Sequence, residues 1–444
     1  MKGGETKDGG NGQGILFMEV RKMHKRLKKI GLGLVAAGLC MTLLLTGAIP
    51  LCEAGPNERV VKIGHHVALT GALATIYVDA THGSVDHVRY INEQEGINGV
   101  KLEMMWEDTQ GLISRSIMAH KRFRDAGAIA EIQCDVTCTE TLTPAYQREE
   151  IPAMYGAGIT SPMVTYPVRW VFTYTAAHGP QTVRFMEWAK ANWAEERPLR
   201  IGFIIFDLAV AWDEMKGGRE WAPQMGMEFV GYEVVPIWGV IDTSTEWLRM
   251  MNKKPDWVFV GAGGAALVTL ARDAHRLEAQ QKDIKLCSAV YGMDESHAKA
   301  IGKGAEGWYV LKPAPSPVET DLPGVKLTNE VAKKYRGFKP EEVSSHYRAG
   351  WLYISIFAEA IRLAMERVGY ENLTGRAFRD AMVTIKNYDT PEMIGGMIPP
   401  ITITEECPFA VASIKMYKVE GGKILPLTDW LKCPYNLPEL EHET

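Results

Sequence analysis

Residues 60–110 read VVKIGHHVALTGALATIYVDATHGSVDHVRYINEQEGINGVKLEMMWEDTQ. The apolar residues that begin at Val60 predict a buried strand, and apolar residues at helical spacing predict a helix over Ala80–Glu93. Gly96-Ile97-Asn98-Gly99 interrupts that helix, and Lys101–Trp106 predicts the next strand. A strand, a helix and a second strand in this order are typical of a parallel sheet that is covered by helices.

An export signal is predicted in front of this stretch. Six basic residues between positions 21 and 29 precede an apolar run, Ile30–Ile49, and Cys52-Glu53-Ala54 fits a cleavage site after Ala54. We therefore expect a periplasmic protein whose first 54 residues are an N-terminal extension and a signal peptide. Two alternatives stay open. One is an uncleaved membrane anchor, and the other, less favoured because leucine precedes each cysteine, is a lipid anchor on Cys40 or Cys52.

The mature chain is long and acidic. Residues 1–54 hold eight basic and four acidic side chains, so the whole-chain charge of -5 becomes −9 without them. An acidic protein is a poor binder of nucleic acid, and no nucleic-acid partner is expected. The remaining length is enough for two lobes with a hydrophobic core each.

Strand-like and helix-like segments continue to alternate through Pro313. A second series of strands is predicted at residues 199–206, 227–235, 256–261 and 284–290, which favours a second parallel sheet. Two segments are predicted to connect the lobes, Val171–His178 and Tyr309–Pro317. Three prolines in the second segment exclude a regular helix or a central strand there. Ser345–Val368 is predicted as a long amphipathic helix that returns to the first lobe.

Four further segments follow the opening stretch in a characteristic order: CTETLTPA (138–145), IPAMYGAGITSP (151–162), DTSTEWLRMMNKKPDWVFVGAGG (242–264) and IGKGAEGWYVLKP (301–313). Together they resemble the branched-chain amino-acid-binding family of periplasmic receptors for ABC transporters. The resemblance implies the type I periplasmic binding fold, an α/β fold of two doubly wound parallel-sheet lobes joined by a three-segment hinge. It places lobe I at residues 55–177 and 314–395 and lobe II at 178–313 and 396–444, with a third connection near Gly395–Pro400.

The resemblance also implies a site for a ligand carboxylate at two strand-to-helix turns. Thr139 matches a family position that offers a hydroxyl, Gly158 one that offers backbone, and Thr160 one that offers both. A helix start attracts anions by its N–H groups and dipole, although a threonine there can equally cap the helix.

Tyr77 and Trp212 fall at or beside aromatic pocket positions of the family. Val290, or Tyr291 after a shift of one residue, stands where amino-acid receptors place a carboxylate for the ligand ammonium. An apolar residue at that place would leave the ammonium unpaired, unless Asp294, whose other interpretation is a helix N-cap, replaces the acid. We therefore expect a ligand that carries a carboxylate, either an amino acid or an organic or aromatic acid that lacks the amine.

Other motifs give weaker indications. Gly261–Ala266 matches the dinucleotide pattern G-x-G-x-x-G/A, but it follows the third strand of its lobe, and the next strand ends without an acid, so a small-residue turn beside a cleft is favoured. His65 and His66 point to opposite faces of a strand, and they and His178 are expected to be structural. Cys407 with Cys433 is the preferred disulfide.

The resemblance implies the substrate-binding component of an ABC importer, which we expect to be a monomer that captures a small ligand and delivers it to an inner-membrane permease. No enzyme activity, cofactor or metal is expected, since no hydrolase, zinc-protease or P-loop motif occurs. Two alternatives stay open, a ligand sensor for a membrane receptor and, less favoured, a nucleotide-dependent enzyme built on the Gly261 turn.

Overall fold

The computed structural model describes residues 59–434 except 72, 157, 165 and 166. The predicted export signal and its cleavage after Ala54 lie outside the described residues. Among the helices described, none combines the length and the apolar character needed to cross a membrane. The described chain folds as two lobes, each built on a sheet of its own, which confirms the predicted fold class.

Lobe I contains a sheet of six strands whose neighbours are all parallel. The strand order is β11 (Phe409–Val411), β5 (Val171–Thr175), β4 (Ala153–Tyr155), β3 (Ala130–Gln133), β1 (Val60–Val67) and β2 (Lys101–Asp108). The middle strands are buried along almost their whole length, as expected for a parallel sheet with helices on both faces.

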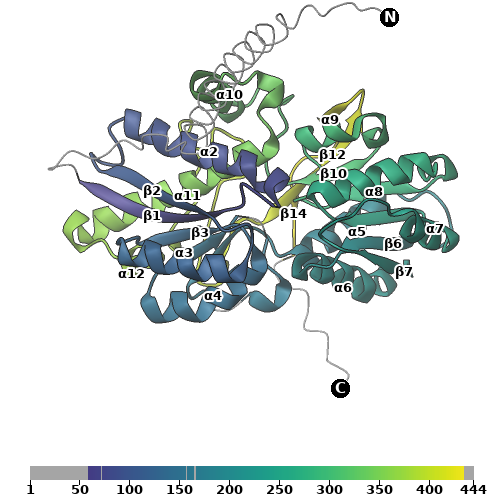
Figure 1. Ribbon diagram of the computed structural model, residues 1–444, viewed down its shortest axis with the longest axis horizontal. Coiled ribbons are helices and arrows are strands. Elements are labelled where there is room, and N and C mark those ends of the chain that lie inside the picture. The colour runs from purple at the N-terminus through teal and green to yellow at the C-terminus, as the bar shows by residue number, and fades with distance from the viewer. Residues whose placement is uncertain (1–58, 72, 157, 165–166, 435–444) are drawn as a thin grey trace, which may run out of the picture. The chain divides into compact units, whose positions relative to one another are not determined.

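The helices of lobe I are α2 (Ala74–Glu93), α3 (Ile113–Asp125), α4 (Val136–Glu149), α10 (Pro323–Arg336), α11 (Ser345–Val368) and α12 (Gly375–Met382). α11 has the predicted bounds and lies against α2 (Figure 1). The two helices touch backbone to backbone, because a Cβ on Gly83 would lie 1.9 Å from the Tyr347 carbonyl oxygen, and one on Gly350 1.8 Å from that of Ala80. α2 begins six residues before the predicted Ala80.

Lobe II contains the second sheet, in the order β13 (Lys423–Pro426), β12 (Ser413–Glu420), β10 (Tyr309–Lys312), β9 (Lys285–Ser288), β8 (Trp257–Gly261), β6 (Arg200–Phe206) and β7 (Glu228–Val235), with β14 (Leu431–Lys432) paired to β12. The strands from β10 to β7 are parallel, whereas β12 runs antiparallel to its neighbours (Figure 1, yellow). The helices are α5 (His178–Ala191), α6 (Ala209–Gln224), α7 (Ser244–Asn252), α8 (Gly264–Arg276) and α9 (Glu295–Ile301).

The chain passes between the sheets three times. The first passage follows β5 and the second follows β10, so the later part of each predicted connection crosses between the lobes. The exclusion of a central strand from Tyr309–Pro317 was wrong for Tyr309–Lys312, because the three prolines begin only after β10. The third passage lies at Ala412, because β11 still pairs with β5 in lobe I and β12 pairs with β10 in lobe II. Residues 396–411 therefore do not belong to lobe II, to which the sequence had assigned them. β11 has three residues, too few for a periodic pattern to reveal it.

The five cysteines of the described chain are buried. Cys433 carries a free thiol, so the predicted Cys407–Cys433 disulfide is absent. The thiol of Cys407 lies 3.8 Å from the Phe409 carbonyl oxygen.

Candidate functional site

A small cavity lies between the lobes, at the carboxyl ends of strands from both sheets. Its walls include Gly156 after β4 and Thr175 at the end of β5 in lobe I, Val290 after β9 in lobe II, and Pro313 in the second connection. In parallel sheets, ligands bind outside the carboxyl ends of the strands. The cavity has a volume of ≈ 30 Å³, which holds about two water molecules. The lobes must therefore separate before a larger ligand can enter.

Tyrosine side chains from both lobes supply most of the polar groups of the cavity wall. Tyr77 comes from α2, Tyr353 from α11, and Tyr291 from the loop after β9. The hydroxyls of Tyr77 and Tyr155 lie 3.3 Å apart, and the hydroxyl of Tyr353 donates to the Gly156 carbonyl oxygen. Burial raises the pKa of each of these phenols above its usual value. They are therefore neutral hydrogen-bonding groups at neutral pH.

A buried carboxylate lies directly behind Tyr291. The Tyr291 hydroxyl donates to Oε2 of Glu214 across 2.9 Å, and Nδ1 of His178 lies 3.0 Å from Oε1. Burial raises the pKa of Glu214, and the bonds from His178 and Tyr291 oppose that shift. Gly261 at the end of β8 makes room for this carboxylate, because a Cβ there would lie 2.5 Å from Oε2. Burial and bonding hold the carboxylate in one place.

The neighbouring carboxylate, Asp213, links α6 to the first connection. Its Oδ2 accepts a hydrogen bond of 2.7 Å from the backbone N–H of Gly179 and one of 3.0 Å from the hydroxyl of Ser161. Burial raises the pKa of Asp213, although these bonds favour the charged form. Glu214 and Asp213 together fix the first turns of α6 against the segment where the chain enters lobe II.

A second polar cluster joins the lobes beside the cavity. Asp294 caps α9 by accepting a bond of 2.9 Å from the backbone N–H of His297, and its Oδ1 lies 2.6 Å from Nδ1 of the same histidine. His346 of α11, which lines the cavity, places Nδ1 3.0 Å from Oδ2 of Asp294. Burial on its own would raise the pKa of Asp294, but the two histidines outweigh it and hold the pKa well below its usual value. Asp294 therefore pairs across the lobes as a charged group, and its predicted role as a helix N-cap is confirmed.

Two of the six predicted site residues, Tyr77 and Tyr291, share the cavity wall. Val290, the other alignment of the Tyr291 position, lines it too. Gly158 lies outside the wall and against the first connection, because a Cβ there would lie 2.1 Å from the Ala176 carbonyl oxygen. The structure thus brings together the lobe I aromatic position and the loop after β9.

The two threonines make hydrogen bonds within the protein. α4 begins at Val136 and is capped by Asp135, whose carboxylate accepts a bond of 2.9 Å from the Cys138 N–H. Thr139 lies in the first turn and donates its hydroxyl to the Asp135 carbonyl oxygen across 2.7 Å. The hydroxyl of Thr160 donates to Oε1 of Glu140 across 3.1 Å. An acidic side chain thus stands at each of the two turns where the sequence predicts a ligand carboxylate.

Trp212, Trp238 and Trp308 are not among the residues that line the cavity. Trp212 donates from Nε1 to Asp207 across 2.8 Å and packs edge-on against Tyr232, away from the residues that line the cavity. Trp308 is fully buried in lobe II. Trp238 is 54% exposed, yet its ring would lie 3.4 Å from a Cβ on Gly71 of lobe I. Trp238 therefore contacts the other lobe at the rim of the cleft.

The turn at Gly261–Ala266 also packs across the lobes. A Cβ on Gly263 would lie 2.7 Å from the Ile76 side chain of α2. The first glycine gives space to Glu214 and the third position, Gly263, gives space to lobe I. The glycines are thus explained by close packing, as expected for a small-residue turn beside a cleft.

The arrangement of two sheets, three connections and an interlobe cavity agrees with the comparison by sequence. Residues 60–423 match the Periplasmic binding protein family. The chain belongs to this family. A search of curated proteins found no match.

Three solved structures resemble this periplasmic binding protein. A branched-chain amino acid ABC transporter protein from Thermus thermophilus with bound valine is 20% identical, with a TM-score of 0.74 over 85% of this chain and 98% of that chain. A substrate-binding protein of an ABC transporter from Aeropyrum pernix is 18% identical, with a TM-score of 0.73 over 85% and 97%. A fatty acid ABC transporter substrate-binding protein from Thermomonospora curvata is 15% identical, with a TM-score of 0.73 over 86% and 95%.

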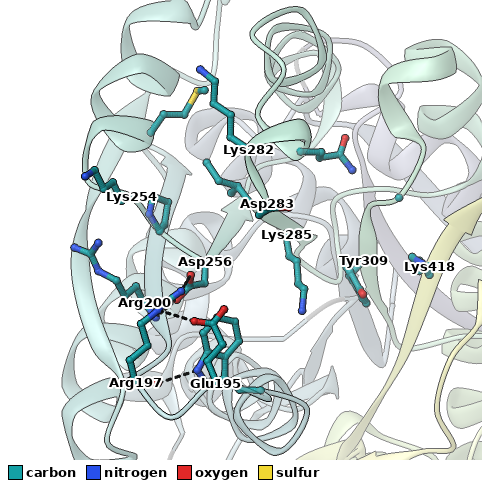
Figure 2. A pocket seen from close by; sticks show the side chains of 16 residues that line it. Glu195, Arg197, Arg200, Lys254, Asp256, Lys282, Asp283, Lys285, Tyr309 and Lys418 are labelled. Carbon is teal, nitrogen blue, oxygen red and sulfur yellow. Dashed lines mark hydrogen bonds and ion pairs between the residues drawn. The ribbon is translucent and has the colours of Figure 1, made fainter.

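A larger hollow lies at the other edge of the lobe II sheet of this binding protein (Figure 2). Its volume is ≈ 960 Å³, and its walls include the amino-terminal ends of β6, β8, β9 and β10. Figure 2 shows Arg197 turned toward Asp256 and Glu195, and all three take part in ion pairs at 2.7 Å. Every lining residue belongs to lobe II, so closure of the lobes cannot bury a ligand here. The interlobe cavity is the better candidate despite its smaller size.

Sequence reasoning missed Glu214, His178 and Tyr353 as neighbours of the cavity. A signal for Glu214 was present, because Asp213-Glu214 lies in the first two turns of the helix that follows an apolar strand of a parallel sheet, where side chains reach the carboxyl edge. Tyr353 lies inside a long helix whose apolar pattern explains it without any role in binding.

Proposed function

We propose that this protein is the extracytoplasmic substrate-binding component of an ABC importer, which captures a small organic ligand between its lobes and presents it to an inner-membrane permease. The observation that carries the proposal is the cavity at the carboxyl ends of strands from both sheets, with tyrosines of both lobes in its wall. A ligand at this place touches both lobes, so its binding energy favours the closed form, which a permease can then distinguish from the open one.

The related structures support a small-molecule ligand, since one holds valine and another belongs to a fatty acid transporter. They share 20% identity or less with this chain, so they support the fold and not a particular ligand. The carboxylate-bearing ligand, and the contacts of Thr139, Gly158, Thr160 and Trp212 with it, stay predictions from the sequence. The acidic groups beside both threonines speak against them.

A ligand screen tests the proposal. A compound that binds the folded protein raises its melting temperature by mass action, so we expect stabilising compounds in a screen of amino acids, amides, amines and organic acids. The same compounds should reduce the radius of gyration in small-angle X-ray scattering, because they close the lobes. A protein that no compound stabilises, or that binds without closing, would contradict the proposal.

Export and delivery need experiments of their own. We expect the mature protein in the periplasm with Gly55 as its first residue, which sequencing of the N-terminus checks. We expect a monomer in light scattering. The liganded protein should stimulate ATP hydrolysis by its permease in proteoliposomes, whereas a sensor for a membrane receptor would not.

A further inference from the structure

The interlobe cavity offers a particular set of polar groups. Of the described residues that line it, none is a lysine or an arginine. His346 is the one histidine among them, and its Nδ1 faces the carboxylate of Asp294 at 3.0 Å. A ligand carboxylate would therefore enter a wall that has no lysine or arginine among its described residues and whose one histidine already faces an acid.

Two hydroxyl groups of the wall donate their protons to other groups of the protein. Tyr291 donates to Glu214, and Tyr353 donates to the Gly156 carbonyl oxygen. A phenol that has already donated its proton can still accept a hydrogen bond through its oxygen. Tyr291 and Tyr353 therefore offer acceptors, which suit ligand N–H groups and do not suit the oxygens of a carboxylate. The Tyr77–Tyr155 pair keeps one hydroxyl proton beyond its mutual bond.

Negative groups surround the cavity at the next layer. Glu214 lies behind Tyr291, and Asp294 lies behind His346. The charge of Asp135 adds to the rise in the pKa of Tyr77 and Tyr155. Its carboxylate also accepts a hydrogen bond from the Cys138 N–H at the α4 N-terminus. Burial raises the pKa of Glu214 and of Asp135, because the loss of water disfavours the charged form of each carboxyl group. A further anion would be repelled, whereas a cation or an N–H donor would be attracted.

His178 adds one more hydrogen-bond acceptor behind the wall. When His178 donates from Nδ1 to Glu214, its Nε2 is left as an acceptor, and within the described chain this buried atom has no partner. The ring of His178 packs edge-on against that of Tyr291, with centroids 5.3 Å apart. An unpaired acceptor thus lies close behind the same part of the wall.

We propose that the ligand of this cavity is a nitrogen donor without a carboxylate, an organic amide or amine, whose N–H groups lie against Tyr291 in front of Glu214. This inference rests on the proposed function, because it names the ligand class of the same site. Its physical basis is the match between donors on the ligand and acceptors in the wall, because no lysine or arginine is among the described residues that line the cavity.

Compounds that share a carbon skeleton test the inference on the intact mature protein. The first probes are phenylacetate, phenylacetamide and phenethylamine, together with isovalerate, isovaleramide and isoamylamine. The best compound from the ligand screen, with its matched acid, amide and amine, forms the deciding series. We expect the amide or the amine to bind at least about tenfold more tightly than the acid in calorimetry, as one unpaired buried group implies.

The outcomes separate the two proposals. An acid that binds as tightly as its amide and amine, or more tightly, overturns the ligand class and leaves the receptor function in place. A screen without any stabilising compound overturns the receptor function, and the ligand class with it.

A charge variant locates the effect. Glu214→Gln keeps the shape of the side chain and removes its charge, so we expect amine affinity to fall by about tenfold or more while amide affinity changes by less than about threefold. Glu220→Gln on the same helix is the matched control, because the Glu220 side chain is 36% exposed and should change neither affinity. Circular dichroism checks that Glu214→Gln folds. Equal losses for amine and amide would show that Glu214 does not act by its charge and would overturn its assignment to the ligand.

Discussion

Tyr291→Phe removes the hydroxyl that donates a hydrogen bond from the loop after β9 to the buried Glu214. The bond measures 2.9 Å, and Tyr291 and Glu214 are 6% and 1% exposed, so water cannot easily replace the lost donor. A hydrogen bond to a charged group contributes about 1.5–3 kcal/mol, and we expect the free energy of unfolding to fall by that amount at neutral pH. For a chain of this size, the loss corresponds to a decrease of a few degrees in the melting temperature.

The loss should depend on pH. The bond from Tyr291 lowers the pKa of Glu214, against a burial effect that raises it above the ordinary 4.5. A carboxyl group with a raised pKa in the folded protein reduces stability above that pKa, and the penalty is relieved as the pH falls toward the unfolded value. Because Tyr291→Phe raises the pKa of Glu214 further, its effect should be largest at neutral pH and smallest near pH 4.5.

Differential scanning calorimetry of the mature protein at the two pH values measures this difference. Tyr232→Phe is the matched control, since Tyr232 is 38% exposed and its hydroxyl makes no buried bond within the described residues. The same decrease at both pH values, or no decrease at neutral pH, would refute the charge-dependent role of the Tyr291 hydroxyl.

Three more predictions concern the packing of the lobes. In lobe I, burial favours the neutral form of Glu131 but hydrogen bonds from His120 and His66 lower its pKa below 4.5, while the bonds of His120 to Glu131 and Glu149 raise its pKa above 6.5 against burial. The contribution of Glu131 to the free energy of unfolding is lost as the pH falls below 4.5, and that of His120 is lost as the pH rises above 6.5. Glu131→Gln should therefore lower the free energy of unfolding by about 3–5 kcal/mol between these pH values. It should also flatten the profile of melting temperature against pH. Gly83→Ala should destabilise lobe I by about 1–3 kcal/mol or more in urea unfolding, because the new methyl meets the Tyr347 carbonyl oxygen; a change within about 0.5 kcal/mol would contradict the contact between α2 and α11. Trp238→Phe at the rim of the cleft should alter stability by less than about 0.5 kcal/mol but remove most of the fluorescence change that a ligand produces, and an unchanged signal would show that Trp238 does not report on closure.

The order of strands and helices along the chain predicted most of the fold. The apolar strands of both sheets and the helix over Ser345–Val368 carry strong periodic patterns, and the structure confirms them within a few residues. The second connection was predictable from Pro313 onward, since the prolines after β10 exclude regular structure, whereas the strand β10 itself was not foreseen. The third connection was not predictable, because β11 has three residues and its place depends on its pairing with β5 rather than on its own sequence.

Part of the candidate site could also be predicted from the sequence. The resemblance to the family pointed to Tyr77 and Tyr291, which line the cavity, while their contact with a ligand stays a prediction. Asp294 as a helix cap is a local property of the residues that follow it. The sequence by itself also determined that the chain alternates strands and helices in two series, because hydrophobic periodicity is set by each segment alone.

The tertiary structure decided which groups meet. Glu214 lies 77 positions from Tyr291 in the chain, and the bond between them exists because α6 and the loop after β9 reach the same edge of one sheet. Asp135, rather than Thr139, caps α4, because the helix begins at Val136, two residues before Cys138. The position of the first helical residue decides whether an acid or a hydroxyl is the cap. The charge and the hydrogen-bonding character of the cavity depend on these long-range contacts, and no local pattern encodes the distance between two segments that are far apart in sequence.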